Sequence, residues 1–102
     1  MVTKMHREYR FIDLFAGCGG LSEGFYRKGY KALLHLEIAP AACKTLKTRM
    51  KHYNYSNDEI ENAVLCADIT SDGIIEEIDS RIHEKVDLII GGPPCQAFSS
   101  AH

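Results

Sequence analysis

The chain alternates short apolar runs with amphipathic stretches, and this alternation limits its possible folds more than any other feature. The apolar runs are residues 11–15, 30–36, 63–67 and 86–90. Each has the length of a buried strand, and the stretches between them carry apolar residues at helical spacing. Strands that alternate with helices form a parallel sheet. We therefore predict a doubly wound α/β fold with about four parallel strands and three helices.

The helices are predicted from apolar spacing and from residues that start or stop a helix. The first helix carries Leu21 and ends near Gly29, which suits a left-handed stop, and the second begins at Pro40. The buried face of the third helix is predicted to consist of Ile74, Ile75, Ile78 and Ile82. Residues 51–62 are polar and aperiodic, so we expect a surface loop there.

Composition limits the class of protein. The chain has 102 residues, so we assign residues 1–102 to one domain or to a part of one. Its net charge of −2 provides no general attraction for nucleic acid, which must be held by a local site or by something outside this chain. No apolar run approaches the ~20 residues of a membrane span, and no export signal is seen, so we expect a cytoplasmic protein. The four cysteines are widely separated, which predicts no metal site.

The ends of the first three predicted strands carry residue types that suit an adenosine-containing cofactor. The glycine-rich segment 15–20 (FAGCGG) precedes a predicted helix, where exposed amides bind ligands. Glu37 follows the second strand and is placed to accept hydrogen bonds from ribose hydroxyls. Asp68 and Ile69 follow the third and suit an adenine amino group and ring. Simpler roles stay open: a tight turn, a solvated acid at a helix start, and a helix cap.

The fourth predicted strand runs into residues 91–100 (GGPPCQAFSS), in which two prolines restrict the backbone beside Cys95. A reactive thiolate requires a lowered pKa, which exposed backbone amides at a helix start can provide. Cys95 is therefore a candidate nucleophile. A structural loop thiol is the alternative.

Two blocks carry a resemblance to a known family: residues 13–21 (DLFAGCGGL) and residues 87–99 (DLIIGGPPCQAFS). Together with Glu37 and with Asp68 and Ile69 between them, they resemble the amino-terminal part of the DNA cytosine-C5 methyltransferases. The resemblance spans residues 11–100. It implies a partial, Rossmann-like methyltransferase sheet, S-adenosyl-L-methionine as cofactor and a bacterial cytoplasmic location. Membership of a restriction-modification system stays open.

The resemblance also assigns roles to individual residues. It implies that the cofactor is bound by Phe15, Ala16, Gly17, Cys18, Gly19, Gly20, Glu37, Ile38, Asp68, Ile69 and Pro93. Glu37 would hold the ribose, Asp68 and Ile69 the adenine, and Ile38 the other adenine face. Cys95 would be the catalytic nucleophile that adds to C6 of cytosine, and the loop that meets the substrate would include Pro94, Gln96 and Ser99. One departure is Ala39 followed by Pro40, where the family often has a more polar pair.

The family places its general-acid glutamate, its arginines, its target-recognition region and a final cofactor-site helix beyond the part that this chain matches. We therefore expect this chain alone to be inactive and to meet double-stranded DNA only in a complete enzyme. The rest of that enzyme would be a longer chain or a complementary C-terminal polypeptide. Alternatives are a non-catalytic S-adenosylmethionine-binding fragment, a subunit of a split methyltransferase, and an RNA cytosine-C5 methyltransferase.

Two other enzyme classes fit less well. A nicotinamide-dependent dehydrogenase shares the glycine turn and the acidic ribose partner, but it has no use for the Pro-Pro-Cys-Gln segment. Amino-group methyltransferases carry an Asp/Asn-Pro-Pro-aromatic segment at the same strand end. Gly92 and Cys95 oppose that interpretation.

Overall fold

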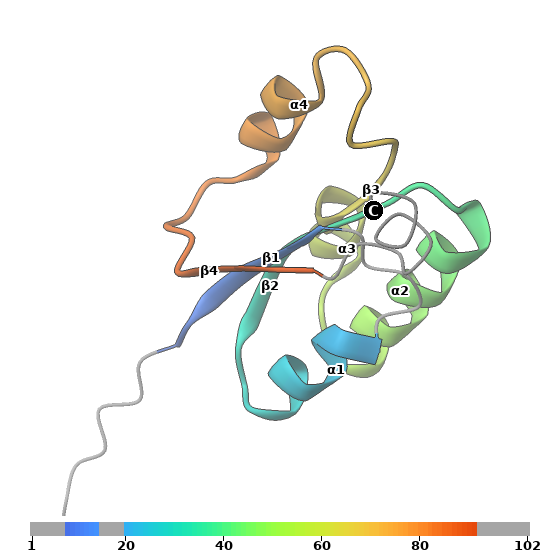
Figure 1. The fold of residues 1–102 in the computed structure, drawn as a ribbon. Helices are drawn as coiled ribbons and strands as arrows, with labels where there is room; N and C mark the ends of the chain where they lie inside the picture. The colour runs from blue at the N-terminus through green and yellow to red at the C-terminus, as the bar shows by residue number, and fades with distance from the viewer. Residues whose placement is uncertain (1–7, 15–19, 92–102) are drawn as a thin grey trace, which may run out of the picture.

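The computed structural model of the chain describes residues 8–14 and 20–91. The four strands are β1 (Arg10–Leu14), β2 (Lys31–Glu37), β3 (Val64–Cys66) and β4 (Leu88–Ile90). They form one sheet in the order β3-β2-β1-β4, and all pairings are parallel (Figure 1). The predicted α/β fold with a parallel sheet is thus confirmed.

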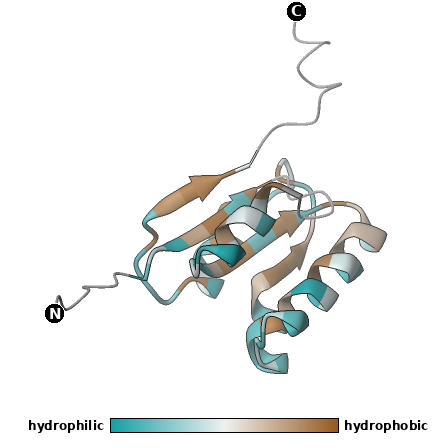
Figure 2. Cartoon of the chain, turned by 90° about the horizontal axis from the view of Figure 1, so that it is seen from below, coloured by the Kyte–Doolittle hydropathy of each residue, from teal (hydrophilic) through white to brown (hydrophobic). Residues whose placement is uncertain are grey.

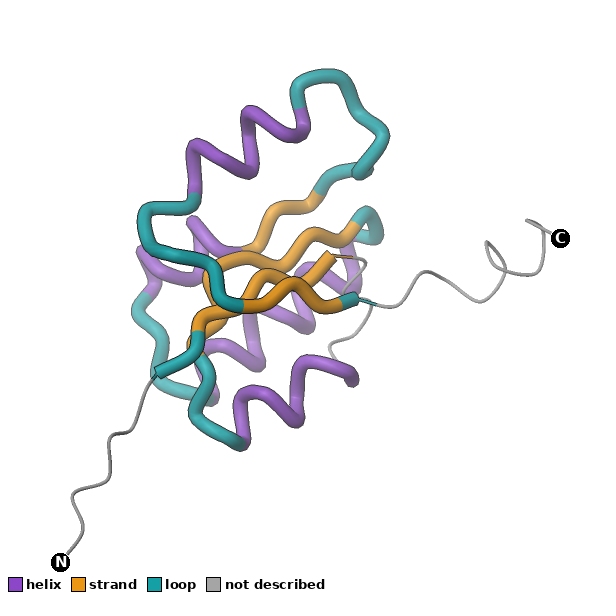
Figure 3. Tube along the Cα trace, turned by 60° about the vertical axis from the view of Figure 1, so that its left-hand side comes forward, coloured by secondary structure: helices purple, strands orange, loops and turns teal. Residues whose placement is uncertain are grey.

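Helices cover both faces of this sheet. They are α1 (Gly20–Arg27), α2 (Pro40–His52), α3 (Asn57–Ala63) and α4 (Ile74–Arg81). One hydrophobic cluster joins β1 to α1, α2 and α3, and a second joins the opposite sheet face to α4. Figure 3 shows α4 alone on its side of the strands. The strands are the most continuously hydrophobic elements (Figure 2), as expected of a sheet buried on both faces.

The prediction of a surface loop over residues 51–62 is wrong. The described residues contain one more helix than predicted. Helix α2 continues to His52, and α3 follows after a short turn. Ser56 accepts a hydrogen bond from the Glu59 amide, and the Glu59 side chain accepts one from the Ser56 amide, which forms a capping box. Only Ile60 and Ala63 of α3 are buried, so the segment shows almost no apolar periodicity.

The other helices largely follow the prediction. Pro40 is in the first turn of α2, and Gly29 has the left-handed φ of 83° expected of a helix stop. Ile74 and Ile78 of α4 are buried as predicted. Ile75 is 61% exposed, and Ile82 lies beyond the end of α4 and is only partly buried, so these two assignments to the buried face need correction.

A local irregularity in β2 sets which side chains face which helices. Phe11 pairs with Ala32 and Ile12 pairs with Leu34, so Leu33 is an extra residue in β2. Leu33 and Leu34 both join the cluster on the α4 side. Such a bulge changes the direction of the residues that follow. His35 consequently lies on the α1 side of the sheet, opposite Asp13 in the register of β1 and β2.

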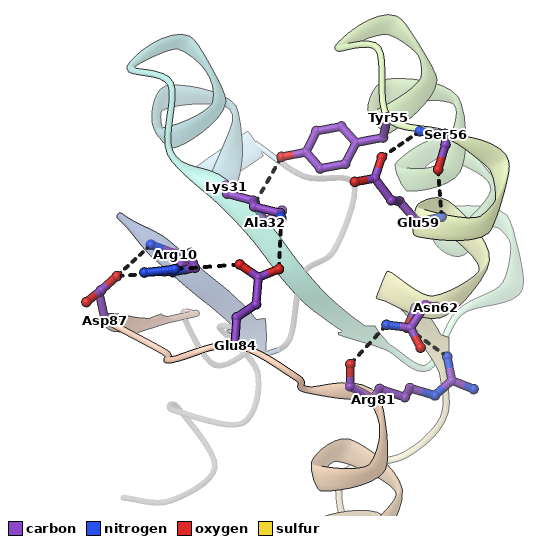
Figure 4. A network of polar contacts seen from close by, with 10 residues as sticks. All are labelled: Arg10, Lys31, Ala32, Tyr55, Ser56, Glu59, Asn62, Arg81, Glu84 and Asp87. Carbon is purple, nitrogen blue, oxygen red and sulfur yellow. Dashed lines mark hydrogen bonds and ion pairs between the residues drawn. The ribbon is translucent and has the colours of Figure 1, made fainter. Parts of the chain in front are cut away.

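The connection from α4 to β4 is held by charged contacts at the amino ends of β1 and β2 (Figure 4). Glu84 accepts a hydrogen bond from Lys31 Nζ at 2.8 Å and forms an ion pair with Arg10 at 3.6 Å. Asp87 Oδ2 accepts a hydrogen bond from the Arg10 amide at 2.9 Å. These contacts fix the start of β4 beside β1.

No helix in the described part of the chain is long and apolar enough to cross a bilayer.

Candidate functional site

The carboxyl ends of the strands lie at one edge of the sheet, because all four strands are parallel. Leu14 pairs with Leu36, and Glu37 pairs with Cys66, so the ends of β1, β2 and β3 are immediate neighbours. Asp68 follows two residues after β3. In an open α/β sheet this edge is where ligands bind.

The structure describes five of the predicted cofactor residues: Gly20, Glu37, Ile38, Asp68 and Ile69. The others lie outside the described residues: Phe15, Ala16, Gly17, Cys18, Gly19 and Pro93. The predicted nucleophile Cys95 and the predicted loop residues Pro94, Gln96 and Ser99 also lie outside them. Gly20 is the first residue of α1, so a helix does follow the glycine-rich segment as predicted.

Glu37 is the last residue of β2 and is half-buried. Its Oε2 accepts a hydrogen bond from the amide of Ala39 at 2.8 Å, which anchors the carboxylate on the turn between β2 and α2. Two thiols brace the same turn: Cys43 donates to the carbonyl oxygen of Glu37 at 3.3 Å, and Cys66 donates to that of Ile38 at 3.8 Å. The position of the Glu37 carboxylate is thus determined by several local contacts.

Asp68 organises the turn after β3. Its Oδ1 accepts hydrogen bonds from the Thr70 amide at 2.9 Å and from the Thr70 hydroxyl at 2.8 Å. These bonds lower the pKa of Asp68 below its ordinary value because they stabilise the carboxylate. The N-cap of α4 is Gly73, so Asp68 does not cap that helix as the alternative interpretation supposed. An ionised acceptor is therefore held at the sheet edge.

Apolar side chains accompany the two acids. Ile38 is 60% exposed at the turn after β2, and Ile69 is half-buried against the cluster below α4. The exposed side chain of Ile38, next to Glu37 in the chain, offers a surface on which a flat ring can pack. The edge therefore combines hydrogen-bond acceptors with an apolar surface. No cluster of side chains suited to a metal ion occurs among the described residues.

Gly91 determines where the chain leaves β4. Its φ is 140°, and a Cβ at this position would lie 1.9 Å from the carbonyl oxygen of Leu14. Only glycine allows such an approach. Gly91 therefore lies directly beside Leu14 at the end of β1, at the same edge of the sheet as Glu37.

A buried polar network formed by Tyr26, His35 and Asp13 was not predicted from the sequence. The Tyr26 hydroxyl lies 2.6 Å from His35 Nε2, and His35 Nδ1 lies 3.0 Å from Asp13 Oδ2. The three residues are 6%, 0% and 1% exposed, respectively. The only signal in the sequence is a polar residue inside each of two apolar runs, Asp13 and His35.

A hollow lies at the opposite edge of the sheet, where β2 begins. We call it the tyrosine-lined hollow; it has a volume of about 360 Å³, and its lining includes Tyr26, Tyr30, Tyr53, Tyr55, Glu8 and Glu59. It contains none of the described residues that the sequence predicts for the cofactor. The acids at the carboxyl ends of the strands therefore remain the candidate site.

The described residues form an α/β protein with a four-stranded parallel sheet and two carboxylates, Glu37 and Asp68, at its carboxyl edge. A family model described as C-5 cytosine-specific DNA methylase matches residues 9–102. The chain therefore belongs to the C-5 cytosine-specific DNA methylase family, and the resemblance inferred from the sequence is confirmed.

Individual relatives agree with this assignment. The type II methyltransferase M1.HphI of Haemophilus parahaemolyticus is 38% identical over 91 residues, which cover 89% of this chain and 22% of the relative. M.PspPI of Psychrobacter sp. is 38% identical over 99% of this chain and 21% of its own length. M.AquIA of Picosynechococcus sp. is 36% identical over 92% of this chain and 35% of its own length. The chain thus spans about a fifth to a third of these relatives.

We expect an alkylating reagent at pH 8 to modify Cys66 faster than Cys43. Burial, assisted by the neighbouring Cys66 thiol, raises the pKa of Cys43 to about 12, so little of the reactive thiolate exists at this pH. Cys66, by contrast, is exposed. Time-resolved peptide mapping measures both thiols in one sample. Faster labelling of Cys43 in the folded protein would contradict the described burial; in urea the two rates should converge.

Proposed function

We propose that this chain is the cofactor-binding and nucleophile-bearing part of a DNA cytosine-C5 methyltransferase. The complete enzyme would transfer a methyl group from S-adenosylmethionine to C5 of cytosine in double-stranded DNA. The observation that carries this proposal is the arrangement of Glu37, Ile38 and Asp68 at one sheet edge, in a chain that belongs to the C-5 cytosine-specific DNA methylases.

The residues at this edge fit the chemistry of S-adenosylmethionine. The Glu37 carboxylate is suited to accept hydrogen bonds from ribose hydroxyls. The hydrogen bonds that hold Asp68 as a carboxylate favour an acceptor role toward the adenine amino group. Ile38 and Ile69 would contact the adenine ring, which would cover the exposed surface of Ile38. Phe15, Ala16, Gly17, Cys18, Gly19, Gly20 and Pro93 would complete the cofactor site.

Cys95 would provide the nucleophile. C5 of cytosine is a poor nucleophile until a thiolate adds to C6, which makes C5 an enamine-like carbon able to attack the methyl group. S-adenosylmethionine would supply the methyl group, whose bond to sulfur would break as the bond to C5 forms. A base in the complete enzyme would then take the C5 proton, and the electron pair of that C–H bond would expel the Cys95 thiolate from C6. The exit of the chain from β4 beside Leu14 supports this role, because Cys95 follows shortly after Gly91.

The remainder of the enzyme would pack beside β4. In the part that the structure describes, β4 pairs with β1 alone, and Ile89 on β4 is 62% exposed. The target carbon of cytosine is stacked inside the duplex, so the base must be flipped out by surfaces that recognise DNA. We propose that a further segment, or a complementary C-terminal polypeptide, supplies these surfaces, and that this chain alone is inactive. The bacterial cytoplasm is the location we infer from the relatives.

Replacement of Glu37 by alanine should weaken binding of S-adenosylmethionine by about 1.5 to 3 kcal/mol, or roughly 10- to 150-fold, the usual value of hydrogen bonds to a charged group. Isothermal titration calorimetry on the complete enzyme measures the effect. Glu61→Ala is the matched control, because Glu61 is an exposed glutamate that pairs with Lys47 and lies outside the proposed site. If Glu37→Ala binds the cofactor as tightly as Glu61→Ala, the ribose assignment is wrong.

Cys95, and no other cysteine, should become covalently attached to DNA that carries 5-fluorocytosine at the target position. Fluorine at C5 blocks the elimination that would release the enzyme after methyl transfer. Incubation of the complete enzyme with S-adenosylmethionine and this duplex, followed by peptide mapping, locates the adduct. Cys95→Ser should abolish the adduct and preserve cofactor binding. Cys18→Ser should still form the adduct. An adduct on Cys18, or one that survives in Cys95→Ser, would overturn the mechanism.

A further inference from the structure

The buried network of Tyr26, His35 and Asp13 links three elements that border the proposed cofactor site. Asp13 is next to the last residue of β1, and His35 lies two residues before Glu37 on β2. Tyr26 belongs to α1, which begins at Gly20 immediately after the glycine-rich segment. The network therefore connects the strand that enters this segment, the helix that leaves it and the strand that carries Glu37.

One assignment of donors and acceptors satisfies both hydrogen bonds of the network. A carboxylate oxygen accepts and a tyrosine hydroxyl can donate, so the His35 tautomer with a proton on Nδ1 donates to Asp13 Oδ2 and accepts at Nε2 from the Tyr26 hydroxyl. Burial raises the pKa of Tyr26 above its ordinary value, which keeps the hydroxyl protonated as a donor. Each polar group thus fixes the rotation of the next.

The surrounding packing restricts these side chains further. The Tyr26 ring stacks on Tyr53 with ring centres 4.8 Å apart and planes inclined by 8°. Phe11 meets the edges of Tyr26 and His35, with ring centres 6.0 Å apart in both cases. These contacts leave the three residues little freedom to adopt another arrangement.

One acceptor of the network has no partner in the described part of the chain. Asp13 Oδ1 is buried and receives no hydrogen bond there. Buried carboxylate oxygens nearly always receive a donor, because an unpartnered one is costly. Asp13 lies at the carboxyl end of β1, so its orientation bears on the same edge of the sheet as Glu37.

We propose that Tyr26, His35 and Asp13 are positioning residues for the cofactor site. By holding the carboxyl ends of β1 and β2 and the start of α1 in one arrangement, they preorganise the site for S-adenosylmethionine without touching the reacting atoms. The proposal rests on the proposed function. It assigns to His35 and Tyr26 a role in cofactor affinity rather than in the chemical step.

The test compares Tyr26→Phe with Tyr55→Phe in the complete enzyme. Both substitutions remove one hydroxyl from neighbouring rings of the same cluster, but the Tyr55 hydroxyl accepts a hydrogen bond from the Ala32 amide and does not belong to the network. Tyr26→Phe should raise the KM for S-adenosylmethionine about two- to tenfold, the equivalent of one neutral hydrogen bond, and leave kcat at saturating cofactor unchanged. Both variants should lower the melting temperature by a similar amount. Tyr55→Phe should leave the KM for S-adenosylmethionine unchanged.

A second pair of variants tests the donor to Asp13. His35→Asn retains an N–H group near the position of Nδ1, whereas His35→Leu does not, so the asparagine variant should bind S-adenosylmethionine more tightly than the leucine variant. Equal KM values for Tyr26→Phe and Tyr55→Phe, with normal binding by the unmodified enzyme, would overturn this proposal alone. Absence of binding by the unmodified enzyme would overturn the proposed function and this proposal with it.

Discussion

The parallel pairing of β1 with β2 is the interaction on which the other features of the structure depend. It places Asp13 opposite His35 and brings Leu14 beside Leu36, so that the carboxyl ends of both strands reach the same edge. The remaining strands extend this pair, with β4 beside β1 and β3 beside β2. Glu37 and the turn that carries Asp68 lie at the same edge of the sheet because the parallel strands β2 and β3 end together.

Burial on both faces makes this pairing stable. Phe11 and Leu34 have no exposed surface, nor has Met50 of α2, and Leu46 of α2 is almost as completely buried. Full burial of such side chains contributes about 1.5 to 3 kcal/mol each. An exposed ion pair such as Arg27 with Glu23 contributes little, because water and salt screen it. The sheet is therefore held by its hydrophobic clusters, and inside one of them Tyr26, His35 and Asp13 Oδ2 are hydrogen-bonded to one another.

The sequence predicted the strands well because each apolar run is separate and ends at glycine or an acid. It failed at α3, where a polar segment folds through a capping box and buries only Ile60 and Ala63. The Ser56 and Glu59 pattern was present, but apolar periodicity gave no support. Ile75 was assigned to the buried face of α4 because it is apolar, yet it points away from the sheet and is 61% exposed.

The candidate site was predictable where single residues follow strands, as with Glu37 and Asp68. The network of Tyr26, His35 and Asp13 was not, because its contacts join residues far apart in sequence and depend on the extra residue Leu33 in β2. Neither the bulge nor the resulting direction of His35 is visible in the alternation of apolar and polar residues. The exposure of Cys66 also depends on the fold, because its short strand β3 is an outer strand of the sheet.

Binding of S-adenosylmethionine at the carboxyl edge of the sheet can be measured by titrating the isotopically labelled complete enzyme with this cofactor and recording NMR spectra of the backbone amides. The largest chemical-shift changes should fall on Ile38, Ala39, Ile69 and Thr70, with little change around the tyrosine-lined hollow at the opposite edge. Changes confined to Tyr30, Tyr55 and the other residues of that hollow would contradict binding at the carboxyl edge.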